Sequence, residues 1–148
     1  MSRHGENGMK IKKLLLSTLG SFVFLLLINA ILFPVFFPDG PPARYENTRP
    51  APLVQYHLLA FIISAFLMSY LYPLLSRGGP AWKEGLKVGV IMGLFVSLPD
   101  TLHVYALVET PLLVQLLPAV WVCAIWGGAG VVIGLIYGKE GIIGATSS

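Results

Sequence analysis

The stretch GLFVSLPDTLHVYAL, residues 93–107, is apolar enough to cross a lipid bilayer, and yet it carries Pro99, Asp100 and His103 within five positions. The rest of the chain is equally apolar: 55% of its 148 residues are hydrophobic and only 11% are charged. A soluble domain of this size needs more charge to cover its surface. The sequence therefore predicts an integral membrane protein, in which the presence of Asp100 and His103 needs a physical reason.

Four apolar segments are each longer than the roughly 20 residues that a helix needs to cross a ~30 Å hydrocarbon core. Helices are the expected form, because backbone polar groups inside lipid must be satisfied within their own segment. The sequence predicts an all-α, polytopic four-transmembrane-helix bundle that forms a single membrane domain over residues 1–148. The expected spans cover residues 14–37, 53–75, 86–108 and 112–137, with an external loop at 38–52.

Basic residues flank the predicted spans unevenly. On the side of the two termini and of the loop between the second and third spans, they are Arg3, Lys10, Lys12, Lys13, Arg77, Lys83, Lys87 and Lys139. The other side has only Arg44 and Arg49. Lysine and arginine are enriched in cytoplasmic segments, so this bias predicts that both termini lie in the cytoplasm. Tyr70, Tyr72 and Tyr137, close to the same side, are typical of the membrane interface.

Glycines recur at intervals of four in two of the spans. Residues on this spacing share one face of a helix, and small residues let membrane helices approach closely, as in the GxxxG motif. We therefore expect the third and fourth spans, which are antiparallel neighbours, to pack tightly on this side; a homodimer through the same stripes is the alternative. The glycines are Gly85, Gly89 and Gly93 in the third span and Gly130, Gly134 and Gly138 in the fourth.

Each of the four spans contributes a polar residue to the external half of the membrane. At ~1.5 Å per residue, Asp100 and Asn29 lie roughly 12 Å below the external boundary. His103, His57 and Gln115 lie roughly 5–7 Å below it. An aspartate facing lipid is costly, so Asp100 is expected to face the interior of the bundle.

Two structural roles for Asp100 are open. Pro99 removes a backbone donor and is expected to kink the third helix, and Ser97 and Asp100 are typical of the N-cap and N3 positions of a helix that restarts there. Asp100 could instead pair with His103, which lies one turn away on the same helix. Both roles are structural and involve no ligand.

Two functional roles are also open. Asp100, His103, His57 and Asn29 could form a small outward-facing pocket, because aspartate and histidine pairs in membranes serve as proton relays. His57 and His103, at similar depth on different helices, could alternatively hold a haem b iron from both sides. No metal-ion site or catalytic set is recognised, and haem is the one cofactor that the sequence leaves open.

Some functions are excluded by what the chain lacks. The single cysteine, Cys123, rules out an intrachain disulfide, a redox cysteine pair and a thiolate metal cage. The dispersed positive charge, +3 in total, does not form the basic face that nucleic-acid binding requires.

Three motifs carry a resemblance: WKEGLKVGVIMGL at residues 82–94, LPDTLHVYAL at 98–107 and GGAGVVIGLIYG at 127–138. In these the chain resembles small, functionally uncharacterised four-span proteins of bacterial inner membranes. The resemblance implies a location in the inner, cytoplasmic membrane and carries no known activity.

The sequence favours a non-catalytic accessory or scaffold subunit, because it has little soluble mass, glycine-lined helix faces and no catalytic set. Its expected partners are the lipid bilayer and other membrane subunits or a second copy. A proton-linked carrier or channel component that uses Asp100 and His103 is the alternative. A haem- or quinone-linked redox subunit and an intramembrane enzyme are further alternatives.

Overall fold

The computed structural model describes residues 3–36, 54–107, 109 and 111–138. Over these ranges the chain forms helices α1 (Arg3–Phe36), α2 (Val54–Leu75), α3 (Ala81–Leu107) and α4 (Leu112–Tyr137), and none of the described residues is in a strand. The prediction of an all-α four-helix membrane protein is confirmed. The predicted external loop at 38–52 lies outside the described residues.

Two helices begin earlier than the predicted spans. Helix α1 starts at Arg3, although its membrane-spanning part covers only Ile11–Leu32, so its first turns form a polar extension. Helix α3 starts at Ala81 rather than at residue 86, because Pro80 precedes it and Glu84 lies in its first turn. Both features favour the start of a helix, where the proline needs no backbone donor and the carboxylate complements the helix dipole.

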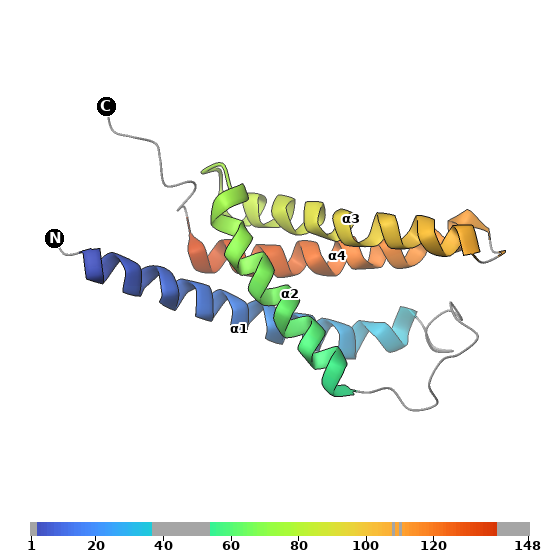
Figure 1. Cartoon of the computed structure of the whole chain (residues 1–148), viewed down its shortest axis with the longest axis horizontal. Helices are drawn as coiled ribbons and strands as arrows, with labels where there is room; N and C mark the ends of the chain where they lie inside the picture. The colour runs from blue at the N-terminus through green and yellow to red at the C-terminus, as the bar shows by residue number, and fades with distance from the viewer. Residues whose placement is uncertain (1–2, 37–53, 108, 110, 139–148) are drawn as a thin grey trace.

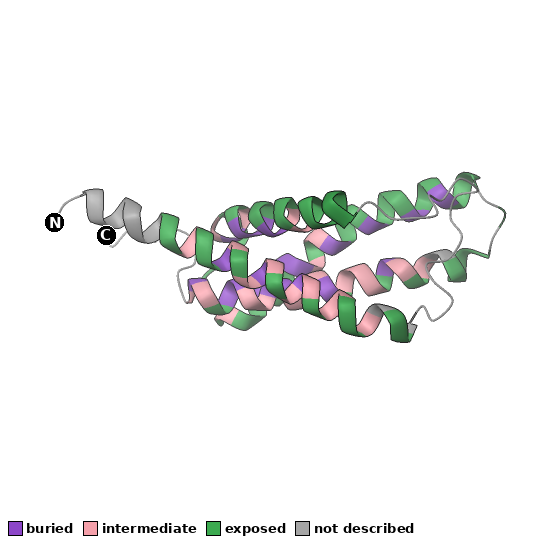
Figure 2. Ribbon diagram, turned by 90° about the horizontal axis from the view of Figure 1, so that it is seen from below, coloured by how far each residue is buried: buried purple, intermediate pink, exposed green. Residues whose placement is uncertain are grey.

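Large apolar side chains cover the outside of all four helices. Only 22% of the most apolar window is buried in each of the first three helices, and 39% in α4. Leu113 and Phe95 are 79% and 75% exposed, and Figure 2 shows exposed residues along every helix. Monomeric soluble proteins do not expose apolar surface on this scale. Together with helices of spanning length, this shows a small integral membrane protein.

The helices form two antiparallel pairs, α1 with α2 and α3 with α4 (Figure 1). The α3–α4 pair has the most extensive contact, and α4 also packs against α1. Helix α2 crosses the bundle obliquely and makes smaller contacts with α3 and α4, whereas α1 and α3 do not touch within the described ranges. The two pairs are therefore joined mainly through α4.

Glycines set the distance between α3 and α4. A Cβ atom added to Gly85 would fall against the carbonyl oxygen of Gly130, and one added to Gly89 against the carbonyl oxygen of Trp126. At Gly93 it would lie 2.9 Å from the Cα of Cys123. The two backbones are thus in direct contact over three turns, which only a residue without a side chain allows.

Gly138 was expected in the same glycine stripe, and the structure places it elsewhere. It is the C-cap of α4, with a φ of 72°, and an added Cβ would meet nothing within 4 Å. Its backbone N–H donates to the carbonyl oxygen of Gly134 at 2.9 Å. Glycine is favoured here because the positive φ ends the helix, and not because another helix approaches.

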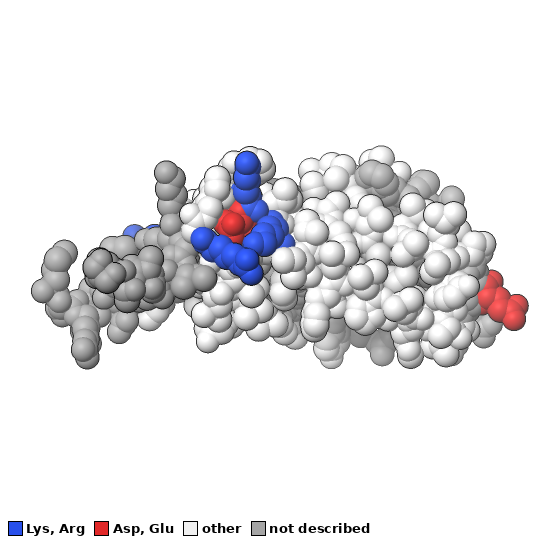
Figure 3. All heavy atoms as spheres, turned by 90° about the horizontal axis from the view of Figure 1, so that it is seen from above, with Lys and Arg blue, Asp and Glu red and all other residues white. Residues whose placement is uncertain are grey.

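The described lysines and arginine gather at one end of the bundle, which we call the basic end. Figure 3 shows a cluster of basic side chains near this end on one face, with a long uncharged surface beyond it. This end contains the start of α1, the α2–α3 turn and the end of α4. Its described basic residues are Lys12, Lys13, Arg77, Lys83 and Lys87. The α3–α4 connection lies at the opposite end.

Candidate functional site

Asp100 and His103 are both exposed side chains of α3. Asp100 is therefore not enclosed by the bundle. The buried face of α3 runs in steps of four through Gly89, Gly93 and Ser97, and its next member is Thr101, only 1% exposed. Helix α4 follows this row of residues, so Thr101 takes the buried position in it.

Helix α3 also runs without interruption from Ala81 to Leu107. The proposed restart of the helix at Ser97 is therefore wrong, because residues on both sides of Pro99 remain helical. Ser97 is buried against α4, where its Oγ lies 3.8 Å from the Sγ of Cys123. Its small side chain extends the close α3–α4 contact beyond the glycines.

The other predicted site residues lie on different surfaces. His57 is exposed on α2, with its ring 4.6 Å from the ring of Phe61 on the same helix. Asn29 on α1 is half-buried and donates to the carbonyl oxygen of Leu25 at 2.8 Å. The side chain of Gln115 lies outside the described residues.

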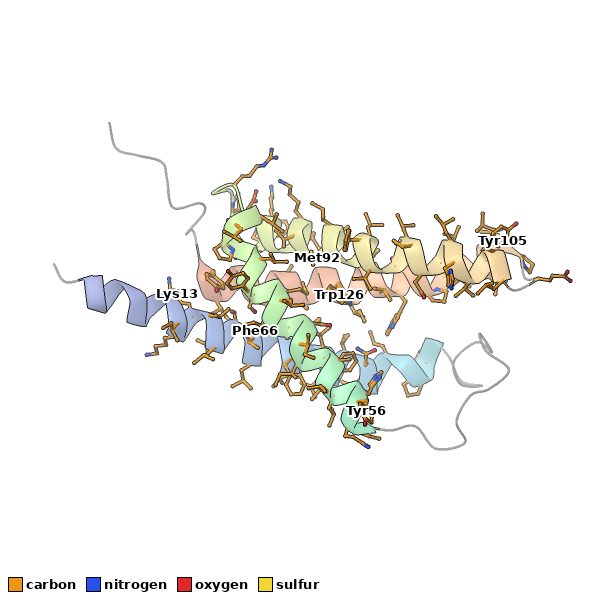
Figure 4. All side chains as sticks on the ribbon, viewed as in Figure 1. Lys13, Tyr56, Phe66, Met92, Tyr105 and Trp126 are labelled. Carbon is orange, nitrogen blue, oxygen red and sulfur yellow. The ribbon has the colours of Figure 1, made fainter. Side chains whose placement is uncertain are left out.

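The structure does not bring these groups into one pocket. Helix α1, which carries Asn29, does not contact α3 within the described ranges. Tyr56, next to His57, and Tyr105, near His103, lie on opposite sides of the bundle (Figure 4). The expected pocket is therefore absent from the described part of the chain, because α2 diverges from α3 toward the end opposite the basic end.

The same divergence separates the two histidines that were considered as haem ligands. An iron held from both sides needs two imidazoles that face each other across a porphyrin. His57 and His103 are instead exposed on α2 and α3, two helices that diverge toward this end of the bundle (Figure 1). One copy of the chain therefore does not form the haem site that the sequence left open.

The described buried polar groups include a set near the basic end. Two of them, Ser17 and Ser21 on α1, are fully buried, and each donates to a carbonyl oxygen of its own helix, at 3.0 Å and 2.7 Å. Tyr72 and Tyr137 were expected at the membrane interface, but they are buried core residues whose rings lie 5.3 Å apart. This part of the bundle, where α1, α2 and α4 meet, is the enclosed one.

A proline explains why Tyr137 points inward. Pro73 lacks the N–H that would normally donate to the carbonyl oxygen of Ser69, four residues earlier. The phenol of Tyr137 on α4 supplies this missing donor at 3.0 Å. The sequence contained a signal for this contact, namely a proline inside a span and a tyrosine at similar depth on another helix.

Comparison of the chain with protein-family models, with curated proteins and with solved structures finds no match. Arguments about its function therefore rest on the placement of its own residues.

Proposed function

We propose that this membrane protein is a non-catalytic accessory or scaffold subunit that binds other membrane helices through the outer face of α3. One observation carries the proposal: His103 lies inside a membrane-spanning helix and its side chain is exposed. Ionisable side chains inside a span are costly where lipid surrounds them, and they usually face a protein partner or a water-filled cavity. A helix of another subunit, with a polar group at the same depth, would remove that cost.

The placement of His103 along α3 supports this reading. It lies four residues, or about 6 Å, before the end of the helix at Leu107, and so within the apolar span. This half of α3 is also not covered by α1 within the described ranges.

The alternative of a proton-linked carrier has less support. A carrier made of one copy needs its titratable groups along an enclosed route, and Asp100 and His103 are both exposed. Proton-coupled uptake by liposomes that contain only this protein, abolished by Asp100→Asn, would nevertheless favour the carrier and contradict the accessory role.

The accessory role can be tested by purification from native membranes in a mild detergent. We expect the chain to elute in a complex larger than its own 16.1 kDa, and His103→Leu to release it as a smaller species. Glu109→Gln is the control, because it changes an ionisable group at the same end but outside the span. Recovery of the wild type only as a single small species would contradict the proposal.

We further propose that the basic end faces the cytoplasm and that the membrane is a bacterial inner membrane. The gathering of lysine and arginine at one end supports the orientation, since such residues are retained on the cytoplasmic side. The resemblance in the three sequence motifs supports the membrane. A fluorescent protein that folds only in the cytoplasm, fused after Ser148, should then fluoresce. A phosphatase that is active only outside, fused at the same position, should be inactive, and the reverse pattern would refute the orientation.

A further inference from the structure

Three basic side chains surround the α2–α3 turn. Arg77, Lys83 and Lys87 are all exposed, and none of them forms an ion pair within the described part of the chain. Lys83 also lies 5.4 Å from the ring centre of Trp82, a distance typical of a cation–π contact. Figure 3 shows the basic side chains gathered around one acidic group on this face. The surface therefore carries more positive than negative charge.

Glu84 holds the turn in this arrangement. Its Oε2 accepts a hydrogen bond from the backbone N–H of Arg77 at 2.8 Å, which fixes the start of the turn beside the first turn of α3. The φ of 80° at Gly78 allows the chain to reverse within this short segment. The N-terminus of α3 adds a positive partial charge of about +0.5 at the same place. An anion bound here would meet three side-chain cations and the helix dipole.

An apolar stripe continues from these cations along α3. At ~100° per residue, Lys83, Lys87, Ile91, Leu94 and Leu98 fall within roughly 80° of one another around the helix. Ile91, Leu94 and Leu98 are 50%, 40% and 43% exposed. From Lys87 to Leu98 the stripe extends about 16 Å, close to the ~15 Å depth of one bilayer leaflet. A molecule that matches this surface has an anionic head and an apolar tail.

We propose that this surface is a binding site for an anionic phospholipid. Its phosphate lies between Arg77, Lys83 and Lys87, and one acyl chain lies along Ile91, Leu94 and Leu98. Guanidinium and ammonium groups are the usual protein partners of phosphate, and basic residues at the ends of spans attract anionic lipids. The apolar stripe favours a lipid over a free phosphate, which would use only the cations.

The test is native mass spectrometry of the purified full chain, with phosphatidylglycerol and phosphatidylcholine added in equal amounts. We expect the wild type to retain phosphatidylglycerol preferentially. Each cation near the surface contributes about a fivefold preference, so a variant with Arg77→Gln, Lys83→Gln and Lys87→Gln should lose most of it. Lys12→Gln removes the same charge at the same end from α1, which does not contact α3 within the described ranges, and it should keep the preference.

Two further measurements distinguish a lost lipid site from a misfolded chain and a lipid from a free phosphate. A variant with Lys83→Arg and Lys87→Arg keeps both charges and should bind as the wild type does, which distinguishes a lost site from a misfolded chain. Soluble glycerol phosphate at the same concentration should not displace the lipid. Equal retention of both lipids by the wild type would overturn the proposal. So would an unchanged preference in the triple glutamine variant, or full displacement by glycerol phosphate.

Discussion

Replacing Gly89 with alanine is expected to lower the free energy of unfolding by about 1–3 kcal/mol, the usual range for overpacking a tightly packed site. The added methyl group would fall against the carbonyl oxygen of Trp126 and close to the Cα of Gly127. These are backbone atoms, so no side-chain rotation can make room for it. Alanine favours a helix over glycine by about 1 kcal/mol, and the net loss is what remains after this gain. Chemical unfolding in mixed micelles measures the difference.

Gly127→Ala is the matched control for this experiment. Gly127 lies on α4 in the same interface, but its added Cβ would meet the ends of two side chains, at 3.1 Å on Leu86 and 3.2 Å on Val90. These can shift by a few tenths of an ångström, so the gain in helix propensity should largely offset the contact. An equal loss in both variants would show that the interface tolerates separation and that direct backbone contact is not what holds α3 to α4.

The glycine spacing was sufficient to predict which helices meet, because a step of four residues defines a face without any knowledge of the fold. It was not sufficient to predict how that face continues. The prediction extended the row from Ser97 to Asp100, whereas the structure extends it to Thr101. Three- and four-residue steps lie on similar sides of an isolated helix, and the crossing angle of the partner selects between them. That angle depends on both helices together.

The candidate site shows a related limit. Depth along a span can be read from the sequence by counting residues, and it placed His57 and His103 at a similar level. The lateral position of a helix cannot be counted in this way. It depends on contacts such as Phe24 against Gly128, which attach α1 to α4 and leave the outer half of α3 uncovered. Residues at one depth were therefore predicted to meet, although the structure holds them on different faces.

The polar groups thus differ between the two halves of the bundle. Near the basic end, where α1, α2 and α4 meet, several hydroxyl groups are buried, and those of Ser17, Ser21 and Tyr137 donate to backbone carbonyl oxygens. Toward the opposite end the ionisable side chains of α2 and α3 are exposed. The closed half contributes packing and hydrogen bonds to the fold, whereas the other half has the exposed polar groups that the proposed accessory role would use. This division agrees with the proposed accessory role.

The hydrogen bond from Tyr137 to the carbonyl oxygen of Ser69, in the half near the basic end, can be tested by substitution. Tyr137→Phe keeps the ring that packs on Tyr72 but removes the hydroxyl that donates to the carbonyl oxygen of Ser69. An unsatisfied buried carbonyl costs about 1–3 kcal/mol. Hydrogen bonds between membrane helices average only ~0.6 kcal/mol, because the separated helices find other partners. Here Pro73 denies the carbonyl its partner within α2, so we expect a loss of about 1–2 kcal/mol in the free energy of unfolding.

A second substitution isolates this cause. Pro73→Ala restores a backbone N–H that can donate to the carbonyl oxygen of Ser69 within α2, so Tyr137 is no longer its only donor. In that background Tyr137→Phe should lower the free energy of unfolding by ~0.6 kcal/mol or less, the value for an ordinary interhelical hydrogen bond. The four proteins form a double-mutant cycle, and its interaction energy should be close to 1 kcal/mol. If Tyr137→Phe lowered stability equally in both backgrounds, the phenol would act through its packing, and the proline would not be the reason that the tyrosine is buried.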